Sequence, residues 1–398
     1  MNTSCERRSS RTLNLLVFLY IFSSLVLTAV PVISRTSLLL AMTMGICLLL
    51  QYIHSGDILI PKWILLPLLF LLYAVTSVWW AADPAGALLS AFILLSAAGG
   101  GLFLLIALLS GASWNAVVYA CFFSGLTLVL TTVPELATLE TNTRLSGILG
   151  NPNGLAINLT VTALVLFTAT KRKLLFTLTG IGFIVFATIV SGSIKMLLFW
   201  AIFLCFVTSR LFKWSTKSYL HQSMLYVIAL MVIAIPLYVG NVLVENFEHL
   251  TVTKRFVLLL SGENNSGNSR MEMFHEALDL WERSPLFGNG IDQVRVLGSH
   301  GTYSHNNYAE MLADFGLIGA TLYYLILGMF LWIGLANLFS PHRQYHLVLL
   351  ISITTLVWDF ALVSYYEKSS WLLMAFSFYL IWQVKQQKQE AGPMKEGE

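Results

Sequence analysis

The feature that most constrains the fold is the repetition of long apolar runs along almost the whole chain. A run of about 20 apolar residues can cross the hydrocarbon core of a bilayer as a helix. Such runs lie near 13–33, 36–53, 62–81, 88–109, 114–133, 153–170, 174–191, 195–211, 221–243, 313–339, 346–363 and 369–384. They predict an all-α integral membrane protein with about twelve transmembrane helices, because a helix satisfies its own backbone groups inside lipid.

The composition supports one polytopic domain over residues 1–398. Charged residues make up 11% of the chain, whereas soluble domains carry about 25%. The net charge of +3 is small and no block of like charge is long enough to suggest a nucleic-acid arm, so no nucleic-acid partner is predicted. None of the four cysteines lies in the long polar loop, which predicts no disulfide there. The apolar run after Arg11 is too long for a signal peptide, so we interpret it as an uncleaved first span.

The distribution of Lys and Arg predicts the orientation, because short cytoplasmic loops are enriched in both. With the N-terminus inside, the outer segments carry Arg35, Arg144, Lys195, Lys254, Arg255, Arg270, Arg283, Arg295 and Lys368, and the other 14 of the 23 basic residues lie inside. We therefore expect cytoplasmic termini and one long extracytoplasmic loop at 244–310. Three polar stretches then share the outer side: Arg144 to Gly154, Ser191 to Lys195, and the long loop.

The long loop is expected to contain a short amphipathic helix over 270–283. Ser269 and Glu272 fit a capping box, with Ser269 as the N-cap. Met271, Phe274, Leu278 and Trp281 recur at helical spacing. Segments rich in Gly and Asn, 262–268 and 288–290, predict turns on either side.

His305 is the first candidate for chemistry, at the junction between the long loop and the following span. A neutral imidazole can take a proton from a sugar hydroxyl near neutral pH. His300 is a weaker competitor in a Gly-flanked turn. The plainer alternative is that His305 only makes a structural hydrogen bond at the junction.

Basic and amide side chains on the outer side are candidate substrate ligands. Arg255, Arg270, Lys195 and Arg144 could hold a pyrophosphate through charge-assisted hydrogen bonds. The alternative is that they meet lipid headgroups or water. Asn151 and Asn153 could bind sugar hydroxyls, although Asn153 could equally cap the span that follows.

Several other chemistries find little support in the sequence. No HExxH motif, DxD-like pair in the long loop or Walker-type phosphate loop is present, so no metal or nucleotide cofactor is predicted. Asp359 is the clearest acid deep in a span, and one such acid gives little support for a proton relay. The lack of an internal repeat argues against an inverted-repeat transporter.

Together, these segments resemble the bacterial O-antigen ligase and O-antigen polymerase superfamily. The resemblance rests on Ser269-Arg270, Pro285 to Gly290, His305-Asn306-Asn307-Tyr308 and Phe315 to Gly319, in that order, and on Arg144 to Ala156, which resembles the family's Asn-Pro-Asn element. One departure concerns the family's Ser-x-Ser-Arg pattern. Ile194 stands at the Arg position here and Lys195 follows it, as a point charge without the guanidinium fork.

The resemblance implies a GT-C-like membrane glycosyltransferase that needs neither metal nor nucleotide sugar. The implied donor is a glycan on undecaprenyl pyrophosphate, and the implied acceptor is another glycan or lipid A-core. His305 would activate the acceptor hydroxyl, Arg270 and Arg255 would hold the pyrophosphate, and Asn306 would join the substrate ligands. The implied location is the bacterial inner membrane, with the site on the periplasmic face and a chain-length regulator as a candidate partner.

Three alternatives remain open at this point. Within the superfamily, the Asn-Pro-Asn element favours a repeat-unit polymerase over an O-antigen ligase. From other classes, about twelve spans also suit a polysaccharide flippase or secondary transporter. A non-catalytic membrane scaffold is the third reading.

Overall fold

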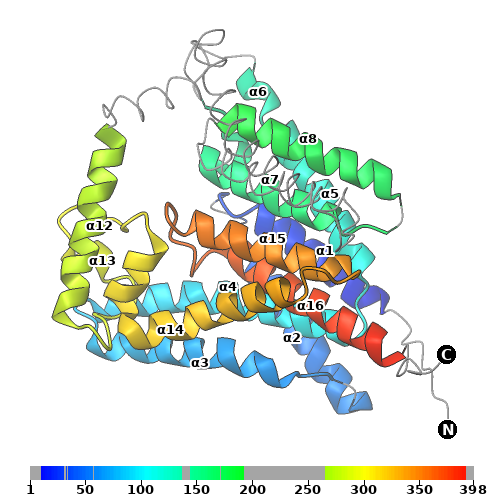
Figure 1. Cartoon of the computed structure of the whole chain (residues 1–398), viewed down its shortest axis with the longest axis horizontal. Coiled ribbons are helices and arrows are strands. Elements are labelled where there is room, and N and C mark those ends of the chain that lie inside the picture. Colours follow the sequence, from blue (N-terminus) through cyan, green and yellow to red (C-terminus); the bar gives the residue numbers. More distant parts are fainter. Residues whose placement is uncertain are drawn as a thin grey trace, which may run out of the picture.

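The structure, a computed structural model, describes residues 10–30, 33, 35–56, 58–136, 144–170, 172–191 and 265–390. Within these residues every regular element is a helix (Figure 1). The longer helices are α1 (Arg11–Val26), α2 (Thr36–Ser55), α3 (Leu65–Thr76), α4 (Pro84–Leu109), α5 (Trp114–Leu130), α7 (Pro152–Leu166), α8 (Lys173–Ser191), α12 (Asn265–Arg283), α14 (Asn307–Ala336), α15 (Arg343–Trp358) and α16 (Lys368–Glu390). Short α6 (Val133–Leu136), α13 (Val294–Leu297) and the 3₁₀ turns η1 (Lys62–Ile64), η2 (Ser77–Trp80) and η3 (Gly147–Leu149) lie between them.

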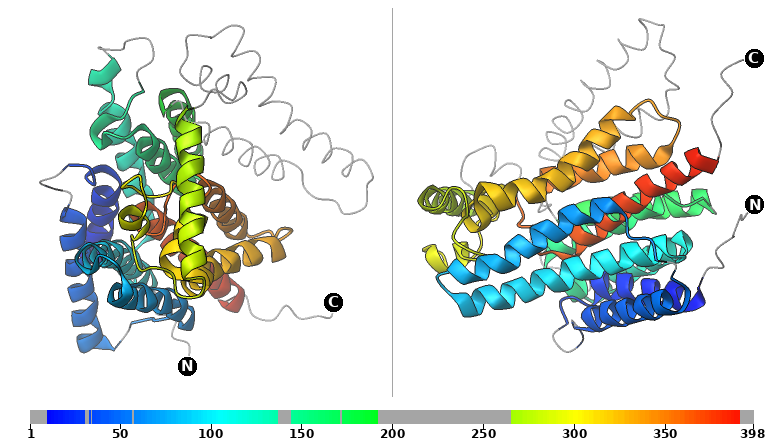
Figure 2. Two further views of the ribbon diagram at one scale, coloured as in Figure 1. Left: turned by 90° about the vertical axis from the view of Figure 1, so that its left-hand side faces the viewer. Right: turned by 90° about the horizontal axis from the view of Figure 1, so that it is seen from below.

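The described helices that correspond to predicted spans alternate in direction along a common bundle. The start of α1 and the end of α16 lie at the opposite end of the bundle from α12 and α13 (Figures 1 and 2). At the α12 end, hydrogen bonds connect segments that are far apart in the sequence. Lys368 Nζ donates to Ser37 Oγ at 2.6 Å, and the Ile291 N–H donates to Ser77 Oγ at 3.0 Å. We call this end the loop end, defined by the segments 27–30, 77–83, 144–151, 284–306 and 359–367.

Five of these helices are long and apolar enough to cross a membrane: Thr36–Ser55, Lys62–Trp80, Pro84–Leu109, Trp114–Glu135 and Asn307–Ala336. Shorter apolar helices lie at Arg11–Val26, Pro152–Leu166 and Lys173–Thr188. A multi-pass membrane protein is therefore confirmed as the class, while the predicted runs 195–211 and 221–243 lie outside the described residues. Several predicted boundaries are wrong by four or more residues; for example, the first helix ends at Val26 rather than near 33, and α15 ends at Trp358 rather than near 363.

Close helix packing in the bundle depends on small residues. A Cβ on Gly101 of α4 would lie 2.9 Å from the Trp371 carbonyl oxygen of α16, so the two backbones approach more closely than a side chain allows. Such contacts are typical of helices packed in lipid, where van der Waals contact replaces the hydrophobic effect. Trp371 is itself buried and packs against Phe70 of α3, with ring centroids 6.4 Å apart.

α14 contains a break at Gly316, where φ is 62° and ψ is −167°. The predicted span started near 313, whereas the helix begins at Asn307, nine residues before the break. The stretch 317–336 alone has a spanning length of about 20 residues. The exposed Trp79 and Phe287 lie near the loop end, where aromatic side chains favour the membrane–water interface. The break thus divides α14 into a short segment, 307–315, and a longer one, 317–336.

The loop Pro285–Gly290 supplies the hydrogen bonds that the break removes. The Leu317 N–H donates to the Pro285 carbonyl at 2.9 Å, and the Gly290 N–H donates to the Asp314 carbonyl at 2.8 Å. Asn289 bonds the Ala313 carbonyl through both its backbone N–H and its side chain. An irregular backbone is tolerated near a membrane only where protein groups satisfy it, so this loop and the break form one structural unit.

Candidate active site at the loop end

The start of α14 is held by two consecutive asparagines. Asn306 is the N-cap: its Oδ1 accepts from the Ala309 N–H at 3.1 Å, and its Nδ2 donates to the Phe360 carbonyl at 3.3 Å. Asn307 is fully buried, and its Oδ1 accepts from the Ser364 N–H at 2.8 Å. Both polar atoms of the Asn306 side chain bond backbone groups of the protein, so this predicted substrate ligand has a structural role.

Asn307 also connects α14 to Asp359, which ends α15. The Asn307 N–H donates to the Asp359 carbonyl at 2.7 Å, and its Nδ2 lies 3.2 Å from Asp359 Oδ2. Tyr324 and Ser364 donate to the same carboxylate, at 3.1 and 2.5 Å. Asp359 therefore anchors the segment 359–367 to α14 through three hydrogen bonds to its carboxylate.

His305 precedes this cap in a left-handed conformation, with φ of 57°. Few non-glycine residues adopt this region, and strained backbone of this kind clusters at functional sites. Its ring lies 4.3 Å from that of Tyr303, and its side chain is half-buried. The structure thus places the predicted base at the loop end, in a conformation imposed by the residues on either side.

Glu310 holds the chain on the N-terminal side of His305. Its Oε2 accepts from the Ser304 N–H at 2.7 Å, while Ser304 Oγ donates to the Asn306 carbonyl at 2.9 Å. Glu310 lies one turn into α14 and is completely buried. Its Oε1 is also buried and has no hydrogen-bond partner among the described residues.

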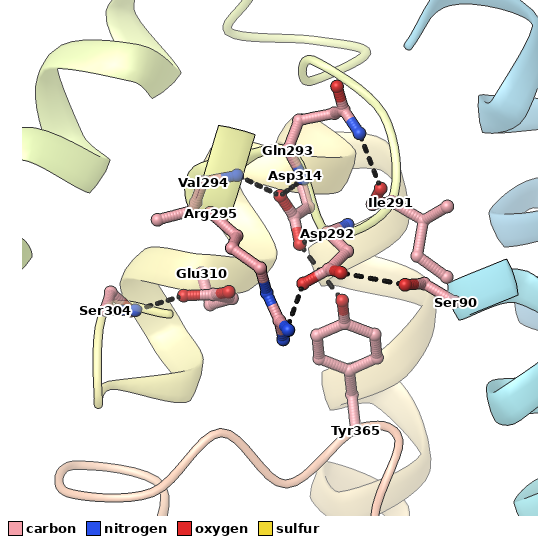
Figure 3. A network of polar contacts seen from close by, with 10 residues as sticks. All are labelled: Ser90, Ile291, Asp292, Gln293, Val294, Arg295, Ser304, Glu310, Asp314 and Tyr365. Atoms are coloured by element: carbon pink, nitrogen blue, oxygen red, sulfur yellow. Dashed lines mark hydrogen bonds and ion pairs between the residues drawn. The ribbon is translucent and has the colours of Figure 1, made fainter. Parts of the chain in front are cut away.

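Asp314, one turn after Glu310, is buried with all of its acceptor positions occupied (Figure 3). The N–H groups of Gln293 and Val294 donate to its Oδ1 at 2.9 and 3.2 Å. Its Oδ2 accepts from the Asp292 N–H and from Tyr365 Oη, both at 3.0 Å. Asp314 therefore fixes the turn before α13 and the segment 359–367 against α14.

Asp292 brings a basic side chain to this cluster. Its Oδ1 lies 3.2 Å from a guanidinium nitrogen of Arg295, and Ser90 Oγ donates to its Oδ2 at 2.8 Å. The Arg295 side chain is 49% exposed. Figure 3 shows it extending between Glu310 and Asp292.

Arg270 lies on α12, which packs on α14 through Ala277 and Leu280. The pKa of Tyr303 is raised by burial, then by the negative charge of Glu367, and the positive charges of Arg270 and Arg295 oppose this shift. The positive charges of Arg270 and Arg295 therefore both influence Tyr303, whose ring lies beside the ring of His305.

The predicted boundaries and apolar face of α12 need correction. The helix begins at Asn265, so Ser269 is inside it and not its N-cap. The four preceding residues join the helix because extending an existing helix costs far less than starting one. Met271 is exposed, and Ala277 and Leu280 form the buried face with Phe274 and Leu278.

His300 does not lie free beside His305 but belongs to a clamp on α12. Its Nδ1 is 3.2 Å from Glu276 Oε2, and the Ser299 N–H donates to Glu276 Oε1 at 2.5 Å. Burial acts to raise the pKa of Glu276, but the hydrogen bonds from Ser299 and His300 outweigh it and lower that pKa.

Three of the predicted ligands, Arg144, Asn151 and Asn153, lie before α7 or in its first turn. Arg144 donates to Asn153 Oδ1 at 2.8 Å. Asn151, rather than Asn153, caps the helix, because its Oδ1 accepts from the Asn153 N–H at 3.0 Å. Pro152 at the first helical position shifts the cap two residues towards the N-terminus. Arg255 and Lys195 lie outside the described residues.

Sequence reasoning did not single out Glu310, Asp292, Arg295 or Asp314 as site residues. Glu310 and Asp314 carried a signal, since two acids at i and i+4 interrupt an apolar pattern just after His305. No sequence pattern indicated that Asp292 and Arg295 join them. Within the described part of the chain, no three His, Cys, Asp or Glu side chains gather as a metal ion requires.

Residues 155–324 match a protein-family model described as O-Antigen ligase. The matched region contains Arg270, His305 and Glu310, together with the loop docked at the α14 break. A comparison with curated proteins found no match.

Proposed function

From the confirmed resemblance of residues 155–324 to the O-antigen ligase and O-antigen polymerase superfamily, we propose that this protein is a membrane glycosyltransferase. It moves a glycan from undecaprenyl pyrophosphate onto a sugar hydroxyl at the extracytoplasmic face of the inner membrane. The acceptor is another lipid-linked repeat unit, which makes the protein a polysaccharide polymerase. The reaction uses no metal ion and inverts the anomeric configuration.

The observation that carries this proposal is the position of His305. It is held in a left-handed conformation at the loop end, between the Glu310–Ser304 hydrogen bond and the Asn306 cap. These contacts fix the backbone that carries the imidazole at the loop end, and proton transfer by such a group is worth about 10²–10⁴-fold in rate.

In the proposed step, the imidazole of His305 accepts the proton of the acceptor hydroxyl. The hydroxyl oxygen forms a bond to the anomeric carbon while the bond from that carbon to the phosphate oxygen breaks. The electron pair leaves with undecaprenyl pyrophosphate, and Arg270 with Arg255 stabilises the developing negative charge. A single displacement of this kind produces inversion.

Ligation to lipid A-core is the second candidate within the superfamily, and the matched family model is described as O-Antigen ligase. The two activities share the donor and differ only in the acceptor. The Asn-Pro-Asn element favours the polymerase, while the described structure of Asn151 and Asn153 is compatible with either.

Transport is the competing class. Transporters place polar binding groups at the midplane of the spans, whereas the buried acids Glu310, Asp314 and Asp359 gather at the loop end. This distribution supports surface chemistry over transport.

The deciding experiment combines purified protein in liposomes with its lipid-linked oligosaccharide donor. Formation of a glycosidic bond between two repeat units supports the polymerase, and product formed only with lipid A-core supports the ligase. Movement of the donor between leaflets without formation of a new glycosidic bond would show that the protein is a flippase and not a glycosyltransferase.

A further inference from the structure

Glu310 differs from the two other buried acids of the loop end in its hydrogen bonding. Asp314 accepts four hydrogen bonds and Asp359 accepts three through its carboxylate. Glu310 accepts one, from Ser304, and its buried Oε1 has no partner among the described residues. An unpaired buried carboxylate oxygen is costly, so its retention calls for a function.

The position of this oxygen points toward substrate. Glu310 is fixed through Ser304, the residue next to His305, so its carboxylate is held close to the proposed base. The half-exposed Arg295 is the side chain beside it in Figure 3. Within the described chain, Asp292 is the one ion-pair partner of Arg295, whose side chain is 49% exposed.

The charge around Glu310 selects the kind of ligand. Burial raises the pKa of Tyr366, and the negative charges of Glu310, Glu367 and Asp292 act in the same direction. These three acids outnumber Arg295, the basic group beside them, so the surroundings favour a hydrogen-bond donor over a pyrophosphate. Arg270, on α12, is the basic group suited to the phosphate.

We propose that Glu310 Oε1 accepts a hydrogen bond from a hydroxyl of the acceptor sugar, so that the acceptor binds at Glu310 and the donor at Arg270. The pyrophosphate takes the Arg270 side, and the acceptor takes the Glu310 side with Arg295 as a second hydrogen-bonding group. This assignment rests on the proposed function and adds an acceptor subsite to it.

Glu310→Gln tests the subsite with minimal disturbance. The amide keeps an oxygen for the Ser304 N–H and places an NH₂ donor where the free acceptor was. Titration of an oligosaccharide fragment of the host's own surface polysaccharide, without donor, should show a Kd about 10–100-fold weaker. The Kd for lipid-linked donor should stay within about twofold, and Tm should not fall.

Asp314→Asn is the matched control, the same change one helical turn away. All acceptor positions of Asp314 serve the protein itself, so this variant should lose thermal stability and keep the acceptor Kd. A panel of deoxy acceptors adds a second measurement: removing one hydroxyl should weaken wild-type binding and have no further effect in Glu310→Gln.

An unchanged acceptor Kd in Glu310→Gln overturns the subsite, as does an equal loss of donor and acceptor binding. Because these titrations require no turnover, they separate the two proposals. A wild type that binds acceptor through Glu310 but forms no glycosidic bond contradicts the catalytic function alone. An active wild type with an unaltered acceptor Kd in the variant contradicts only the subsite.

Discussion

The backbone nitrogen of Gly288 lies 2.6 Å from the position that a Cβ on Gly316 would occupy. The Leu286 carbonyl oxygen is nearer still, at 2.3 Å from that position, and both glycines have positive φ. The loop Pro285–Gly290 and the α14 break therefore meet backbone to backbone, with no room for a side chain at either glycine.

Gly316→Ala should destabilise the protein by about 2–5 kcal/mol, because it combines left-handed strain with overpacking against rigid backbone. Gly328→Ala is the matched control in the same helix, since a Cβ there meets nothing within 4 Å. Thermal unfolding in detergent should show a large drop in Tm for the first and no drop for the second. Equal Tm values would show that the break tolerates a side chain.

His305→Gly should lower the transfer rate by about 10²–10⁴-fold and leave Tm near that of wild type, because glycine readily adopts the same φ. The wild-type rate should fall as acid protonates the imidazole, and the variant should lack this step. His300→Ala, in the neighbouring clamp, should be far milder. A pH step that persists in His305→Gly would assign the base to another group.

Arg270→Ala should reduce the rate roughly 10–100-fold through loss of a charge-assisted hydrogen bond to phosphate. Arg270→Lys should restore only part of it, because the ammonium lacks the bidentate fork. The same loss is predicted for Arg255→Ala. Arg283→Ala, an exposed arginine at the end of the same helix, is the control and should keep full activity at equal protein levels.

The Glu276 clamp should contribute stability that depends on pH. Since the folded pKa of Glu276 is lowered, its contribution is present above the unfolded value of about 4.3 and disappears as the pH falls through the folded pKa. Glu276→Gln should therefore lower Tm at neutral pH, and the difference from wild type should shrink in acid. A difference that stays constant down to pH 3 would contradict this linkage.

Orientation can be tested at two exposed positions at opposite ends of the bundle, in a cysteine-free background. Glu282→Cys on α12 should react with an impermeant thiol reagent in intact spheroplasts. Gln389→Cys, near the end of α16, should react only after lysis. The reverse pattern would place the loop end in the cytoplasm.

The membrane class was predictable because the requirement for spanning helices acts locally on the chain. Each apolar run within the described residues corresponds to a helix, whichever neighbours it later meets. Boundaries were less predictable: Ser269 satisfies a capping pattern and still lies inside α12, since nothing local prevents the helix from extending back to Asn265.

The site was predictable only at residues whose own chemistry and position in the sequence indicate a role. His305 stands out by chemistry and position, whereas the free oxygen of Glu310 becomes visible only when its surroundings are known. The glycines at 288–290 predicted a turn, but their docking into α14 depends on a contact across a long stretch of sequence.

The break in α14 has a consequence for building chimeras between related proteins. The carbonyls freed at Ala313 and Asp314 are bonded by Asn289 and Gly290, so neither segment is complete without its own counterpart. Exchanging only the polar loop, or only the span, would separate partners whose shapes were matched to each other. A functional exchange of acceptor preference should therefore move residues 284–319 as one cassette.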